Sequence, residues 1–180
     1  MAFIAWRVAQ NMLKQMRSAR FDIEIGAQYF AFTREVLVFL TQLLDRMAFE
    51  RLEPEERAAF MNALVKRIGE ILQDNEDGLL GKPPAGQLGY YDQFVDLFNE
   101  LADHYADFGF DAQGPDFAFV RYLGHRIALL MPQKDQRWVL DQVMASEVPD
   151  AFAYLQKALE GVLSTDERSP RAARAGVSGD

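Results

Sequence analysis

The sequence predicts an all-α protein, built as a single-domain helical bundle of about six to seven helices with a disordered C-terminal tail. Apolar residues recur with the 3.6-residue period of a helix along most of the chain, and no segment alternates convincingly with the two-residue period of a strand. The 180 residues are enough to enclose one hydrophobic core. Stretches rich in glycine and proline divide the pattern into separate helices.

The first predicted helix covers about 2–19 and is amphipathic. Its apolar side carries Met1, Ala5, Val8, Met12 and Met16, and its polar side carries Arg7, Gln10, Lys14 and Arg17. The segment 1–21 has four cations and no acid, so it carries +4. Because the whole chain carries -8, the rest carries -12. A basic segment on an acidic protein is typical of an interaction element.

Two longer helices are expected next, over about 22–50 and about 54–75. The first repeats apolar residues at helical spacing, and Gly26 or Thr33 could divide it. The second begins at "LEPEERAAF", where Pro54 suits a first helical turn. The acids that follow it complement the positive end of the helix dipole.

The second half of the chain is divided by two linkers. The first, "DGLLGKPPAGQLG", holds too many glycines and prolines to continue a helix, and a helix over 88–108 follows it. The second, "DAQGPD", precedes a helix over 115–131 that stops at Pro132. Helices are then expected over 134–146 and, started or kinked by Pro149, to about 163. The ordered body is therefore 1–164, with a disordered tail over 165–180.

The segment "DQFVDLFNELADHYAD" places five acids on one side of its helix, away from the apolar side. These are Asp92, Asp96, Glu100, Asp103 and Asp107, with His104 at the border. Carboxylates that bind a di-metal centre must project into a bundle core, so the stripe is interpreted as a solvated face. "QDNEDGLLGKPP" lacks the ligands of a calcium loop at its first and twelfth positions. No metal site is predicted.

Composition and motifs weigh against several classes of function. The chain has no cysteine, which excludes disulfides and thiolate chemistry. No serine lies in a nucleophile elbow and no loop has the spacing that cradles phosphates, so no catalytic residue and no cofactor is predicted. The isoelectric point of about 4.8 disfavours nucleic acid. No apolar run approaches a membrane span and no secretory signal is visible, so a cytoplasmic location is expected.

One segment, "FAFVRYLGHRIALLMP", suggests a ligand pocket. It is apolar on most sides, as in a buried helix, yet Arg121 and His125 lie one turn apart on one flank. These two residues, with Tyr122, form a candidate anion-binding pocket. The alternative is structural: a partly buried arginine in this helix pairs with one of the many acids, because an unpaired buried charge is costly.

The N-terminal helix over 1–20 allows three interpretations. It lies on an anionic membrane surface, it binds a protein partner, or it packs on its own bundle while its cations pair with the protein's acids. The candidate partner-binding residues are Phe3, Ile4, Trp6, Val8 and Met12.

These observations predict a non-enzymatic protein-interaction or assembly protein, either an adaptor or a self-associating helical subunit. A protein partner or a homo-oligomer is expected. The alternative is a helical protein, possibly an enzyme, that binds a small molecule or cofactor near Arg121 and His125.

Overall fold

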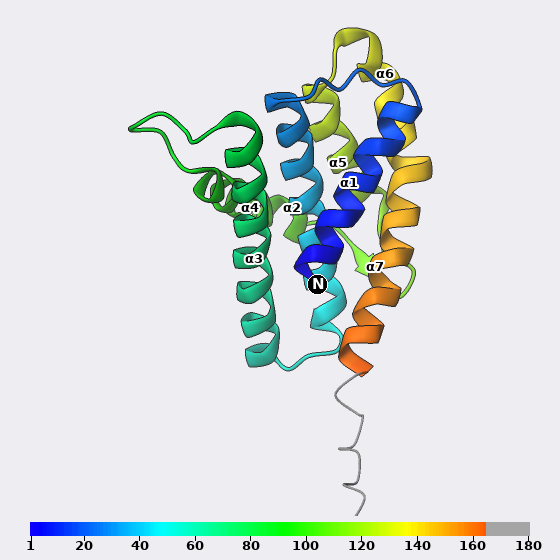
Figure 1. Ribbon diagram of the computed structural model, residues 1–180. Helices are drawn as coiled ribbons and strands as arrows, with labels where there is room; N and C mark the ends of the chain where they lie inside the picture. Colours follow the sequence, from blue (N-terminus) through cyan, green and yellow to red (C-terminus); the bar gives the residue numbers. More distant parts are fainter. Residues whose placement is uncertain (165–180) are drawn as a thin grey trace, which may run out of the picture.

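The computed structural model describes residues 1–164 and confirms the all-α bundle (Figure 1). The helices are α1 (Ala2–Ser18), α2 (Ala27–Phe49), α3 (Pro54–Leu80), α4 (Tyr90–Ala106), α5 (Phe117–Leu130), α6 (Gln133–Gln142) and α7 (Val148–Leu163). A single π-helical turn, η1 (Val143–Glu147), joins α6 to α7, and a minimal hairpin of β1 (Phe110–Asp111) and β2 (Gly114–Pro115) precedes α5. The tail expected over 165–180 lies outside the described residues.

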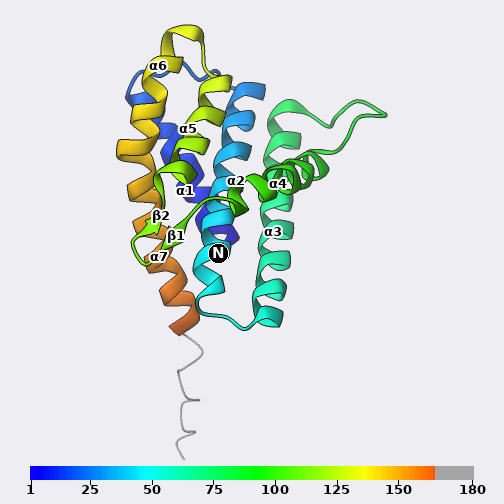
Figure 2. The ribbon, with the colours of Figure 1, turned by 180° about the vertical axis from the view of Figure 1, so that it is seen from behind.

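Helix α2 is the centre of the bundle, with α1, α3, α5 and α7 around it (Figures 1 and 2). Its residues from Phe32 to Leu44 are buried on every side except at Arg34. A helix that is apolar all round is stable only in such a position. The two threonines of this stretch satisfy their hydroxyls locally, since Thr33 donates to Tyr29 O at 2.9 Å and Thr41 to Leu37 O at 2.7 Å.

Helix α1 packs on its own bundle, which confirms the first half of the third interpretation of this helix. Its buried residues are Ala2, Ala5, Val8, Ala9, Met12, Leu13 and Met16. The second half finds no support among residues 1–164. Across residues 1–164, neither Arg7, Lys14, Arg17 nor Arg20 forms an ion pair with an acid. The basic side of α1 is therefore exposed and without an ion pair in the described part of the chain.

Three predicted helix boundaries are corrected by local backbone chemistry. Helix α2 begins at Ala27 instead of 22 because Gly26, at φ 129°, adopts a conformation outside the helix. Helix α3 continues five residues beyond 75 and ends at Leu80, because Gly81, at φ 81°, adopts a conformation outside the helix. Helix α5 begins two residues after Pro115, because the Asp116 carboxylate accepts from Phe119 N at 2.7 Å and caps the helix.

Pro149 lies in the first turn of α7 and so starts the last helix, as predicted, while α6 continues through η1 into α7 without a loop. A proline inside a uniform α-helix removes one hydrogen bond and clashes with the carbonyl four residues earlier. That carbonyl belongs to Ala145, which lies within the widened turn of η1. The π turn therefore accommodates the proline. Its last residue is Glu147, which lies beside α1.

The acidic stripe on α4 is exposed at all five positions, as predicted for a solvated face. His104 is exposed as well, with its ring 5.6 Å from that of Tyr122. Among residues 1–164, no three or more histidines or acids are grouped in a way that could hold a metal ion. No helix in this part of the chain is both long enough and apolar enough to cross a membrane.

Candidate functional site

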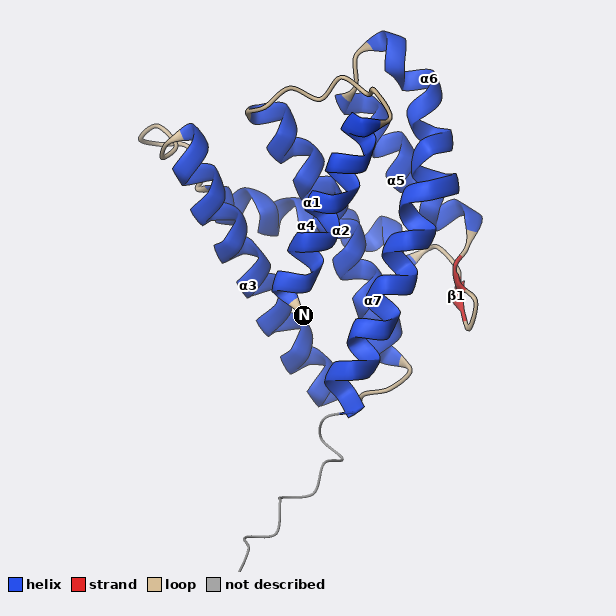
Figure 3. Ribbon diagram, turned by 45° about the vertical axis from the view of Figure 1, so that its right-hand side comes forward, coloured by secondary structure: helices blue, strands red, loops and turns tan. Residues whose placement is uncertain are grey.

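A hollow of about 610 Å³ lies between α1 and the start of α7. The two helices run side by side in opposite directions (Figures 1 and 3). We call this hollow, with its lining residues, the α1–α7 groove. From α1 it is lined at helical spacing by Phe3, Trp6, Arg7, Val8, Gln10, Asn11, Met12, Lys14 and Gln15, and from η1 and α7 by Glu147, Asp150, Ala151 and Tyr154.

Aromatic side chains make the groove partly apolar and leave that apolar surface in contact with solvent. Phe3 is 65% exposed and Tyr154 is 50% exposed, while Trp6 is half-buried. From Phe3 to Gln15 the groove follows twelve residue steps of α1, about 18 Å at 1.5 Å per residue. The site is therefore an elongated, open groove and not a closed pocket.

The two walls of the groove carry opposite charges. Arg7 and Lys14 on α1 form a basic wall, and Asp150 on α7 lies in the facing wall. All three side chains are exposed. None of them forms an ion pair within residues 1–164, so both walls remain available to an external group.

One buried and one half-buried polar side chain, Glu147 and Gln10, lie in the lining of the groove. Glu147 is 2% exposed; its Oε1 accepts from Gln142 Nε2 at 2.9 Å, while Oε2 has no partner among the described residues. Gln10 accepts at Oε1 from the Tyr29 hydroxyl, and its buried Nε2 also has no partner in that part of the chain. Burial raises the pKa of Glu147, and the charge of Asp150 raises it further, against the lowering effect of the Gln142 hydrogen bond.

The structure divides the five predicted partner-binding residues between core and groove. Phe3 and Trp6 line the groove and present surface to it. Val8 and Met12 also line it but are buried, so they belong mainly to the core. Ile4 is half-buried against the core and does not line the groove.

The predicted ligand-binding residues on α5 lie elsewhere. Arg121 and His125 are exposed, and Tyr122 is half-buried with its ring 5.1 Å from that of Tyr105 and 5.4 Å from that of Phe108. None of the three borders the α1–α7 groove or either of two further hollows. The small-molecule prediction thus stays a prediction, and none of these three hollows supports it.

The structural alternative for the segment "FAFVRYLGHRIALLMP", an arginine paired with an acid, is found within residues 1–164 at Arg126 and not at Arg121. Arg126 donates from Nε and Nη2 to the buried carboxylate of Glu35, at 3.0 and 2.5 Å. A bidentate pair of this kind satisfies a carboxylate that would be costly to bury alone. The interaction ties α5 to the central helix α2.

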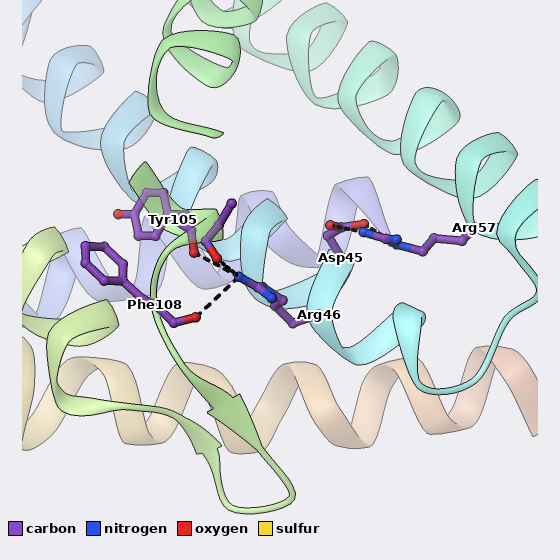
Figure 4. A network of polar contacts seen from close by, with 6 residues as sticks. Asp45, Arg46, Arg57, Tyr105 and Phe108 are labelled. Carbon is purple, nitrogen blue, oxygen red and sulfur yellow. Dashed lines mark hydrogen bonds and ion pairs between the residues drawn. The ribbon is translucent and has the colours of Figure 1, made fainter. Parts of the chain in front are cut away.

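A second hollow, of about 390 Å³, lies between α2, α3 and α4, and its cations are already engaged. Arg57 donates to both oxygens of Asp45, at 2.7 and 2.5 Å (Figure 4). Arg46 donates to Tyr105 O at 3.0 Å and to Phe108 O at 3.3 Å, where it satisfies carbonyls at the end of α4. These contacts hold the bundle together and leave no cationic site for an external anion.

Sequence reasoning missed the α7 side of the groove. Glu147, Asp150, Ala151 and Tyr154 follow the i, i+3, i+4, i+7 spacing of one helix face. That spacing was available in the sequence. The pairing of this face with α1 depends on the tertiary fold.

Comparison with known proteins found no matching family model and no significant match among curated proteins or solved structures. The class is therefore defined by the fold and the groove alone: an all-α bundle with an open interhelical groove of mixed charge.

Proposed function

We propose that this chain is a non-enzymatic protein-interaction or assembly protein, and that the α1–α7 groove is its binding surface. The observation that carries the proposal is an open groove with exposed aromatic side chains and, on both walls, charges that form no ion pair within residues 1–164. A cytoplasmic location belongs to the same proposal and comes from the sequence.

The shape of the groove favours a protein segment over a small molecule. Pockets for small molecules enclose most of the ligand surface, whereas this groove is open along about 18 Å of α1. That length corresponds to about three turns of a helix. An amphipathic helix placed in a groove between two helices is a common form of peptide recognition, with anchor residues at helical spacing.

The composition of the groove also matches a protein interface. Aromatic residues and arginine are enriched in such interfaces, and tryptophan, tyrosine and arginine provide much of the binding energy. Trp6, Tyr154 and Arg7 meet in this groove. The charged side chains at its edges would fix the orientation of the partner more than they would add affinity.

The proposal is tested by a photo-crosslinking amino acid placed at Tyr154 of the full-length chain, in the cells that make the protein. Irradiation is expected to join this position to a protein, which mass spectrometry of the purified adduct identifies. The matched control is the same amino acid at Phe117, which is 68% exposed but lies outside the groove. No protein adduct is expected there.

Two results would contradict the proposal. Adducts of equal yield at both positions would mean that the groove has no preference over other exposed surface. An adduct at Tyr154 with a small molecule, and with no protein, would favour the ligand-binding class.

A further inference from the structure

The α1–α7 groove is complementary to itself. One wall carries the cations Arg7 and Lys14, the other carries the acid Asp150, and exposed aromatic side chains lie between and beside them. We infer that the occupant of the groove is a second copy of this chain, docked groove to groove about a twofold axis parallel to α1 and α7. The inference rests on the proposed function, since it names the partner of the same surface.

The direction of the twofold axis follows from the charges. Rotation about an axis parallel to the groove places α1 of each copy opposite α7 of the other. Arg7 and Lys14 of one copy then face Asp150 of the second copy, and the same contact occurs twice. Rotation about an axis across the groove would place α1 on α1 and oppose like charges. The first arrangement is therefore the favourable one.

The same rotation brings apolar surface together. Phe3 and Trp6 of one copy face Tyr154 of the other, so side chains that are exposed in a single chain are covered in the pair. The helices α1 and α7 of both copies then form four neighbouring helices, and those that meet across the interface are antiparallel. This is the packing of an ordinary four-helix bundle.

The net charge of -8 on each copy opposes association. At physiological ionic strength, however, exposed charges separated by more than about 8 Å are largely screened from one another. The acidic stripe lies on α4, which supplies no residue to the groove. Contact between the opposite charges of the two grooves is much closer, so the local complementarity outweighs the overall repulsion.

The first test is the mass of the purified full-length chain in solution, by sedimentation and native mass spectrometry. The expected result is a species of twice the 20.5 kDa chain. A chain that remains monomeric at ~100 μM would overturn the inference, because that concentration is well above the dissociation constant of a functional interface.

The second test uses a charge exchange. One variant carries Arg7→Glu with Lys14→Glu, and the other carries Asp150→Lys. In a dimer of either variant with itself, like charges face each other at both contacts. The self-association of each variant is therefore expected to weaken about tenfold or more. A mixture of the two restores opposite charges in both halves, and a heterodimer of near wild-type affinity is expected. The substituted side chains are exposed, so both variants should still fold and unfold cooperatively.

The control pair reverses charges away from the groove, with Arg121→Glu in one chain and Asp103→Lys in the other. Both residues are exposed and outside the groove, so the dimer should be unaffected. A dimer that survives the groove substitutions, or a mixture that fails to restore association, would overturn this geometry. If the chain is monomeric and Tyr154 crosslinks to a different protein, the proposed function stands. The second copy is then rejected as the occupant of the groove.

Discussion

At the scale of single residues, the structure uses its buried charges in two different ways. Glu35 is buried in the central helix α2 and receives two hydrogen bonds from Arg126. Glu147 is equally buried but receives only one, from a neutral amide, and its second oxygen is unpartnered within residues 1–164. The first carboxylate stabilises the bundle, whereas the second is destabilised in its charged form and lies in the wall of the groove.

This difference predicts a pH dependence for Glu147. Its pKa is raised above the ordinary value of 4.5 by burial, with a smaller contribution from Asp150. The folded state therefore keeps this proton at pH values where the unfolded chain has lost it. Its contribution to stability is present below pH 4.5 and is lost as the pH rises through the folded-state pKa.

Glu147→Gln removes this dependence on pH, because the amide is neutral at every pH. The free energy of unfolding of the variant, minus that of the wild type, should increase as the pH rises above about 4.5, measured by urea denaturation. The difference isolates Glu147 from Glu76, whose pKa is also raised by burial. Ser146→Ala, in the same π turn and without a titratable group, should keep the wild-type pH profile. A difference in the free energy of unfolding between Glu147→Gln and the wild type that stays constant with pH would contradict a raised pKa for Glu147.

At the scale of elements, the helices were predictable and their exact ends were not. Periodicity identifies each helix because a buried face must repeat every 3.6 residues. The ends depend on single residues whose backbone conformation is visible only in the structure, such as Gly26 and Gly81 at positive φ. The hairpin of β1 and β2 has only two residues in each strand, so it leaves no periodic signal.

Half of the candidate site could be predicted from the sequence. The basic amphipathic character of α1 marked Phe3 and Trp6 as candidate partner-binding residues, and both line the groove. The other half comes from η1 and α7, more than 130 residues away in the sequence. Only the tertiary packing of α7 beside α1 reveals that Asp150 and Tyr154 share the groove. The pocket predicted at Arg121 and His125 assumed burial, and both residues are exposed.

The packing of α3 on α4 allows a comparison of two glycines in one helix. A Cβ atom added at Gly69 would lie 2.6 Å from Cδ2 of Tyr91, whereas one added at Gly78 would meet no atom within 4 Å. Gly69→Ala should destabilise the protein by about 1–3 kcal/mol through overpacking. Gly78→Ala should stabilise it by about 0.5–1 kcal/mol, because alanine favours the helix.

Thermal or urea unfolding of the two variants measures both effects against the same helix. The opposite signs make the pair informative, since a general effect of alanine on α3 would shift both variants in the same direction. Stabilisation by both substitutions would mean that α3 and α4 approach each other less closely at Gly69 than the structure shows.

At the scale of the whole molecule, α1 has two roles that cannot be separated by truncation. One face covers the bundle with Val8, Met12, Leu13 and Met16, and another face forms a wall of the groove. Membrane attachment through the apolar side of α1 would require this helix to leave the core. The basic side, in contrast, can be altered without exposing any buried residue.

The chain 21–180 is therefore expected to lose cooperative folding, and not only association. Each of the four larger buried side chains of α1 contributes about 1.5–3 kcal/mol by burial. Together they contribute about 6–12 kcal/mol, as much as the total stability of a typical domain. Urea denaturation followed by near-ultraviolet circular dichroism should show no cooperative transition for 21–180. The full-length chain with Arg7, Lys14, Arg17 and Arg20 changed to Gln should keep a cooperative transition, because none of these side chains is buried. A cooperative transition of wild-type stability for 21–180 would place α1 outside the core, and would favour its interpretation as a free amphipathic helix that binds an anionic membrane surface.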